Sequence, residues 1–153
     1  MSKAKNRQNV AIKNQKAEFE YFLVSSYTAG IVLSGTEIKS IRAGKANLAD
    51  SYCSFTNNEL WVHHLHISEY SHGSYNNHEP KRERKLLLNR KEINKLLTKL
   101  NERGMTIIPT LLWINENGYA KLDIALARGK KIYDKRESIK NKDNRREATR
   151  IDE

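Results

Sequence analysis

The feature that most constrains the fold lies between residues 105 and 127, where two apolar runs flank a short polar segment at 115–118. That segment contains the Asn and Gly residues typical of tight turns. In the second run, Ala120, Leu122, Ile124 and Leu126 point one way, and Tyr119, Lys121 and Asp123 point the other. The pattern predicts a β-hairpin, with Pro109 at an edge or bulged position of its first strand.

Three further stretches have the character of strands. A short alternation at residues 10–12 predicts a brief strand. The aromatic and β-branched run 19–33 predicts two strands or one long bent strand, with Gly30 at a bulge or tight bend. Residues 51–67 predict a second hairpin that turns at 56–58, because Asn accepts the left-handed backbone conformation. We expect Cys53 to be a small buried side chain of this hairpin, in a reducing compartment.

Two segments have the capping and periodicity of helices. The first starts at Gly35-Thr36, with Thr36 as N-cap and Gly44 as its stop signal. The second, 89–103, opens with a capping box of Asn89 and Glu92 and carries leucines and an isoleucine at helical spacing. The order of elements predicts a mainly β (α+β) fold: a small antiparallel OB-like β-barrel with two to three helices.

At 153 residues the chain has the size of one domain. We expect a body at 1–128, with a flexible N-terminus at 1–9, and a basic tail at 129–153. Ordering a segment of 25 residues costs ~25–50 kcal/mol of backbone entropy. Its four larger apolar side chains would return only ~1.5–3 kcal/mol each. The tail is therefore expected to be disordered when free and to become helical on a polyanionic partner.

The distribution of charge indicates such a partner. The net charge is +10, and residues 1–16 carry five Lys or Arg and no acid. Residues 129–153 carry nine bases against six acids, whereas 17–80 carry three against seven. Basic charge gathered at both ends favours RNA binding, since neutralised phosphates release counterions. The run 81–85 and Tyr133 are expected to face RNA, and Tyr52 to lie in the core.

Catalysis has little support in the sequence. His63, His64 and His66 crowd one predicted strand, with His64 and His66 on one face, but no further ligand of the usual kind lies nearby. We expect no enzyme activity, no metal and no cofactor. Two alternatives stay open: a ribosomal or ribosome-assembly RNA-binding protein, and a nuclease or metal-dependent hydrolase in which the three histidines converge with a carboxylate.

Five segments together resemble the SsrA-binding (small protein B) family of bacteria: 14–17, 28–52, 84–88, 120–131 and 133–137. The resemblance implies an OB-like barrel without catalytic activity, in the cytoplasm and not on a membrane. It also implies that the body binds the transfer-RNA-like part of transfer-messenger RNA (tmRNA). The alanyl form of this RNA, carried by an elongation factor, would be delivered to stalled ribosomes for trans-translation, which rescues the ribosome and tags the incomplete protein.

The resemblance also implies site residues. Those expected to contact tmRNA are Asn14, Lys16, Lys39, Arg42, Lys45, Asn47, Leu87 and Lys121. Those of the tail expected to engage the ribosomal RNA of the decoding centre and the empty messenger channel are Lys130, Lys131, Tyr133, Asp134, Lys135 and Arg136. The sequence departs from the family at Thr28, where a glutamate linked to RNA binding is common. Glu20 and Glu37 are candidates to compensate for it.

Overall fold

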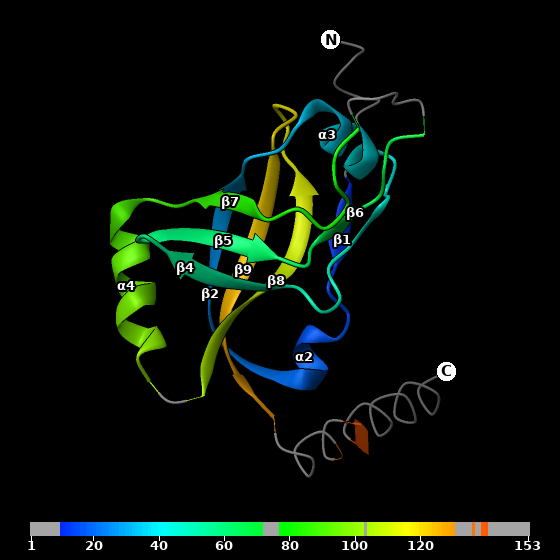
Figure 1. Cartoon of the computed structure of the whole chain (residues 1–153). Coiled ribbons are helices and arrows are strands. Elements are labelled where there is room, and N and C mark those ends of the chain that lie inside the picture. Colours follow the sequence, from blue (N-terminus) through cyan, green and yellow to red (C-terminus); the bar gives the residue numbers. More distant parts are fainter. Residues whose placement is uncertain (1–9, 72–76, 103, 131–135, 137–138, 141–153) are drawn as a thin grey trace.

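A computed structural model describes residues 10–71, 77–102, 104–130, 136 and 139–140 (Figure 1). The predicted flexible N-terminus and most of the predicted tail lie outside these residues. In chain order the elements are β1 (Ala11–Lys13), α2 (Ala17–Glu20), β2 (Tyr21–Ile31), α3 (Gly35–Arg42), β3 (Ala46–Asn47), β4 (Tyr52–Thr56), β5 (Glu59–His63), β6 (His66–Ile67), β7 (Arg84–Leu87), α4 (Arg90–Leu100), β8 (Met105–Ile114) and β9 (Ala120–Gly129).

Seven of these strands form one sheet in the order β1-β8-β4-β5-β7-β2-β9. A further pairing of β8 with β9 closes it into a ring, and the strand pairs that make up the ring are antiparallel. This architecture confirms the prediction of a small OB-like antiparallel barrel. Strand β7 was not predicted, because its sequence reads as a charge run, yet it joins β5 to β2 and so completes the ring.

Both predicted hairpins are present. The turn between β8 and β9 is held by the side chain of Asn115, whose Oδ1 accepts from the backbone N–H groups of Asn117 and Tyr119 at 3.1 and 2.9 Å. The β4–β5 turn places Asn57 and Asn58 at φ 52° and 63°, the left-handed conformation that Asn tolerates. The bulge predicted at Pro109 is also present, since the β8–β9 register shifts between Pro109 and Leu111.

Strand β2 is a single long strand, but its irregularity lies elsewhere than predicted. The register with β9 shifts between Leu23 and Ser25, so the bulge is there and not at Gly30. Gly30 pairs with Leu87 of β7 on one side and Lys121 of β9 on the other. A Cβ at Gly30 would lie 3.4 Å from the Cβ of Leu87, so glycine at this position accommodates the close approach of β7.

Helix α4 begins as predicted, with Asn89 Oδ1 accepting from the backbone N–H of Glu92 at 2.9 Å. In α3 the prediction of Thr36 as N-cap is wrong. The N-cap is Ser34, whose backbone N–H donates to Glu37 Oε1 at 2.8 Å, and Thr36 lies inside the first turn. Within the described residues, no helix combines the length and apolar character that a membrane span requires.

The short helix α2 was missed and alters the burial of β9. Ala17 of α2 packs with Ile108 and Ala127 in a small second apolar cluster. Ala127 is buried in this cluster and Ala125 is also fully buried, although strict alternation along β9 would expose both. The main core inside the ring includes Cys53 as predicted, and burial raises the pKa of its thiol. The prediction of a core position for Tyr52 is wrong, because 41% of its surface is exposed.

Candidate nucleic-acid interface

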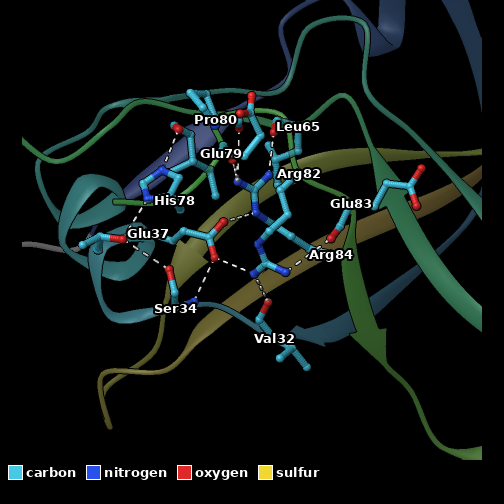
Figure 2. A network of polar contacts seen from close by, with 12 residues as sticks. Val32, Ser34, Glu37, Leu65, His78, Glu79, Pro80, Arg82, Glu83 and Arg84 are labelled. Atoms are coloured by element: carbon cyan, nitrogen blue, oxygen red, sulfur yellow. Dashed lines mark hydrogen bonds and ion pairs between the residues drawn. The ribbon is translucent and has the colours of Figure 1, made fainter. Parts of the chain in front are cut away.

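A buried ion pair fastens α3 to the barrel (Figure 2). The side chains of Glu37 on α3 and Arg84 on β7 are both 0% exposed, and Arg84 Nε donates to Glu37 Oε2. The other two guanidinium nitrogens of Arg84 donate to backbone carbonyls, Nη1 to that of Leu65 at 2.6 Å and Nη2 to that of Pro80 at 3.1 Å. One side chain therefore ties α3 to the β5–β6 connection and to the loop that precedes β7.

The same pair sets the ionisation of Glu37. Burial by itself would raise the pKa of this carboxyl group, but hydrogen bonds from Arg82, the Ser34 backbone and Arg84 outweigh burial, so the pKa is lowered. Arg82 Nη2 donates to Glu37 Oε1 at 2.6 Å. The expectation that segment 81–85 faces RNA is therefore wrong for Arg84, which is fully buried, whereas the side chain of Arg82 bonds Glu37 and remains 38% exposed. Glu37 is likewise sequestered and cannot replace a carboxylate at position 28.

His78 adds a second tie between α3 and the barrel. Its Nε2 lies 2.8 Å from the carbonyl oxygen of Ile67, which can only accept, so Nε2 carries the proton. In the neutral ring Nδ1 then accepts from the hydroxyl of Thr36, 2.9 Å away. Together with Glu37 and Arg84, this histidine fixes the orientation of α3, and hence of the basic side chains on its outer surface.

The predicted contacts from the α3 region form one exposed basic group. Helix α3 buries Glu37, Ser40 and Ile41. The exposed residues of this region include Lys39, Arg42, Lys45 and Asn47. Gly44, at φ 73°, terminates the helix and turns the chain into β3, where Asn47 pairs with His66 of β6. Lys39 Nζ lies 5.5 Å from the ring centroid of Tyr70.

Two other predicted contacts come together around Gly30, although they are far apart in the sequence. Leu87 and Lys121 both pair with Gly30, from opposite sides. Leu87 is 52% exposed, which is unusual for a leucine in a strand of the ring, and Val32 nearby is 46% exposed. Thr28 lies two residues earlier on β2, opposite Asp123.

Sequence reasoning missed Asp123 as a member of this group. The hydroxyl of Thr28 donates to Asp123 Oδ1 at 2.9 Å, and Trp113 Nε1 donates to the same oxygen at 3.0 Å. A carboxylate therefore stands at this surface despite the threonine at position 28. The sequence did contain a signal for this role, because Asp123 occupies an outward-facing position in the alternating run.

Asn14 and Lys16 lie at the junction of β1 and α2. Asn14 is 9% exposed and its Nδ2 donates to the carbonyl of Pro109 at 2.8 Å, so it anchors the chain at the β8 bulge. Both residues line a hollow that Glu20 and Asp50 also line. Asp50 lines a second hollow together with Asn47, so these N-terminal residues adjoin the exit of α3.

Of the predicted tail contacts, Lys131, Tyr133, Asp134 and Lys135 lie outside the described residues. Arg136 is exposed and has helical backbone. Lys130 belongs to the body: its backbone N–H donates to Glu20 O at 2.9 Å, and its Nζ donates to Glu18 O at 2.7 Å. Strand β9 reaches Gly129, one residue beyond the body boundary expected at 128.

The three histidines do not share one strand. His63 ends β5, His64 is left-handed at φ 60°, and His66 opens β6. His63 contacts Glu83 through Nδ1 at 3.1 Å and Ser54 through Nε2 at 2.5 Å. His64 and His66 line one hollow with Asp50. Across the described residues, no group of three or more His, Cys, Asp or Glu side chains is arranged to hold a metal ion.

A closed antiparallel ring with an exposed basic helix fastened to it is the architecture of a small OB-like nucleic-acid-binding protein. The family comparison is specific. A family model described as SmpB protein matches residues 11–153, so the chain belongs to the SmpB protein family.

Relatives named SsrA-binding protein agree with this. The one from Phocaeicola vulgatus is 61% identical over 142 residues, covering 93% of this chain and 95% of the relative. The one from Bacteroides thetaiotaomicron is 59% identical over 143 residues, covering 94% and 95%. A solved structure described as "tmRNA-SmpB: a journey to the center of the bacterial ribosome" matches with a TM-score of 0.69 and 44% identity, covering 80% of this chain and 86% of that one.

Proposed function

We propose that this protein binds the transfer-RNA-like domain of tmRNA and, with the elongation factor that carries the alanyl form, brings it to stalled ribosomes for trans-translation. It acts by binding alone, in the cytoplasm. The body supplies the tmRNA contacts, and the segment after Lys130 enters the empty messenger channel as a helix and engages ribosomal RNA of the decoding centre. We assign these ribosomal contacts to Lys131, Tyr133, Asp134, Lys135 and Arg136.

The observation that carries the tmRNA proposal is the exposed basic group on α3 and its exit. Lys39, Arg42 and Lys45 are exposed while the inner face of the same helix is locked by the Glu37–Arg84 pair. Cations carried on a backbone that is already ordered can follow a phosphate backbone with little further loss of backbone entropy, and the neutralised phosphates release counterions. Membership of the SmpB family, and the names of its relatives, indicate which RNA provides that backbone.

A charge-matched pair of variants tests this surface. The triple variant Lys39→Gln/Arg42→Gln/Lys45→Gln removes three exposed cations from the α3 region. The control Arg90→Gln/Lys91→Gln/Lys95→Gln removes three exposed cations from α4, on the opposite side of the barrel (Figure 1). We expect the first to weaken binding to a tmRNA transcript and to reduce the salt-dependence slope by about one for each lost phosphate contact. The control should leave both nearly unchanged.

Equal losses in the two variants would reject the α3 surface. The class of partner is tested separately by sequencing RNA that co-purifies with the protein, in which tmRNA should dominate. Co-sedimentation with all ribosomes, and no enrichment on stalled ones, would instead identify a ribosomal or ribosome-assembly protein.

A further inference from the structure

Two hollows in the surface meet at Asp50. The larger, about 490 Å³, is lined by Asn47, Ala49, Asp50, His64, His66 and Lys81. The smaller, about 320 Å³, is lined by residues that include Asn14, Lys16, Glu20, Asp50 and Tyr52. Both volumes lie within the range of ~300–1,000 Å³ typical of sites for small organic groups. Because Asp50 lines both, the two hollows adjoin at this residue and are together named the depression.

Two residues in this depression have left-handed backbone conformations. Asp50 has φ 65° and His64 has φ 60°, and neither is glycine. Such conformations are uncommon outside glycine, although Asp, Asn and His adopt them more readily than other residues, and they are found in turns and at binding sites. At His64 the conformation ends β5 and redirects the chain, so that His64 and His66 line the same hollow.

Tyr52 provides an aromatic surface at the boundary of the two hollows. Its ring lines the smaller hollow, stacks on His63 with centroids 4.9 Å apart and planes at 22°, and lies 5.6 Å from the ring of His64. His63 is itself held by Ser54 and Glu83. The tyrosine is therefore an exposed ring whose orientation is fixed from behind, which is what a base-stacking platform requires.

The polar groups differ between the two hollows. The larger has Lys81 and two imidazoles, which can donate to phosphate oxygens, and one carboxylate, that of Asp50. In the smaller, Asn14 has its Nδ2 bonded to Pro109 O, so it offers an oxygen to a ligand, as do Glu20 and Asp50, while Lys16 also lines this hollow and adds a donor. Oxygens of this kind accept from the amino and imino groups on the edge of a base. The larger hollow therefore suits a phosphate and the smaller hollow suits a base, with the ring of Tyr52 at their boundary.

We propose that this depression binds one unstacked nucleotide of the bound RNA. Its base lies in the smaller hollow, stacked on Tyr52 with its donor edge toward Asn14, Glu20 or Asp50. A phosphate flanking this nucleotide lies at His64, His66 and Lys81. The inference rests on the proposed binding of tmRNA. To the expected contacts of Asn14, Lys16 and Asn47, which line these hollows, it adds a position at which a single base is read.

The test uses the full-length protein and a tmRNA transcript, with two measurements: affinity and nucleotide-resolution chemical probing of the RNA. Tyr52→Leu should weaken binding roughly five- to 150-fold, the range for losing one base–aromatic stack. It should also change the reactivity of a single nucleotide, or of that nucleotide and its neighbour. Tyr52→Phe keeps the ring and should retain both the affinity and the reactivity pattern.

A second, charge-matched pair tests the phosphate end without altering the ring. Lys81→Gln should reduce the salt-dependence slope by about one, whereas Lys91→Gln on α4 should not. If wild-type protein does not bind tmRNA, the proposed function itself fails. If wild type binds and Tyr52→Leu leaves affinity and reactivity unchanged, or weakens binding without a localised change in reactivity, the nucleotide site is rejected. Should Tyr52→Leu fail to fold, equal slopes for Lys81→Gln and Lys91→Gln would reject it.

Discussion

The hydroxyl of Thr28 on β2 donates a hydrogen bond of 2.9 Å to Asp123 Oδ1, directly across the strand pair on β9. Trp113 Nε1 donates to the same oxygen from β8. Three strands of the ring thus hold one carboxylate at the surface next to Lys121. The carboxylate that the family resemblance places at position 28 has a counterpart here on the neighbouring strand.

This relationship predicts how substitutions at positions 28 and 123 interact. Thr28→Glu would place two carboxylates opposite each other and should destabilise the protein by ~0.2–1 kcal/mol, since like charges in a cross-strand pair repel. The exchange variant Thr28→Glu/Asp123→Thr should recover stability and tmRNA binding relative to Thr28→Glu alone. Urea unfolding and RNA titration measure both. Purely additive effects of the two substitutions would contradict the prediction.

Removing the charge of Glu37 should destabilise the fold at neutral pH. Glu37→Gln leaves Arg84 buried without its anionic partner, and breaking a buried pair in this way costs ~3–5 kcal/mol. Arg82→Gln is the milder control, because its side chain is 38% exposed and the Arg84 contact remains. Urea unfolding at pH 7 should rank wild type, Arg82→Gln and Glu37→Gln in decreasing order of stability.

The lowered pKa of Glu37 also predicts a dependence on pH. Because the folded state holds the pKa below its ordinary value near 4.5, ionised Glu37 stabilises the protein above that value. This contribution is lost as the pH falls through the lowered pKa. The difference in unfolding free energy between wild type and Glu37→Gln should therefore be largest near neutral pH and shrink in acid. A difference that stays constant from pH 7 to pH 3 would contradict it.

Two adjacent leucines on β7 are expected to have different roles, one in stability and the other in RNA binding. Leu86 is 2% exposed and Leu87 is 52% exposed. Leu86→Ala should cost ~2–5 kcal/mol of stability, as for other buried leucines. Leu87→Ala should change stability little and weaken tmRNA binding, because its side chain is available to the RNA. The prediction fails if Leu87→Ala binds tmRNA as wild type does.

The contacts of Lys130 define where a truncation should be made. A chain ending at Lys130 keeps β9 and the bond to Glu20, so it should fold and retain tmRNA affinity while losing tagging of stalled products. A chain ending at Ala127 also loses the pairing of Arg128 with Phe22 and of Gly129 with Tyr21, and should melt at a lower temperature. Loss of tmRNA affinity in the 1–130 chain would reject the division between body and tail.

Much of the fold could be predicted because it depends on local signals. The Asn89 cap, the turns at Asn57 and Asn115, and the alternation in β9 act within a few residues of one another, and each was predicted correctly in kind. The site was predicted only in part. Resemblance supplied residues such as Leu87 and Lys121, whereas their meeting at Gly30 depends on the register of three strands.

Several of the incorrect predictions depend on tertiary contacts. Arg84 reads as part of a solvated charge run, but Glu37, 47 positions earlier in the chain, makes its burial possible. Tyr52 reads as a core aromatic, but the pairing of β4 with β5 places it on the outside against His63. Helix α2 is too short for periodicity to detect, and it buries Ala127 from a distant part of the sequence. In each of these three cases a contact with another element, and not a local pattern, decides the outcome.

The sequence by itself determined most of the segments that become strands and helices, where the main turns fall, and that positive charge is concentrated outside residues 17–80. These properties depend on backbone preference, capping and composition, which act locally. Only the tertiary structure decided which charges are buried and which are free, and which side chains share one surface. A charge buried at Arg84 is tolerated only because closure of the ring brings it against Glu37, and no local pattern encodes that contact.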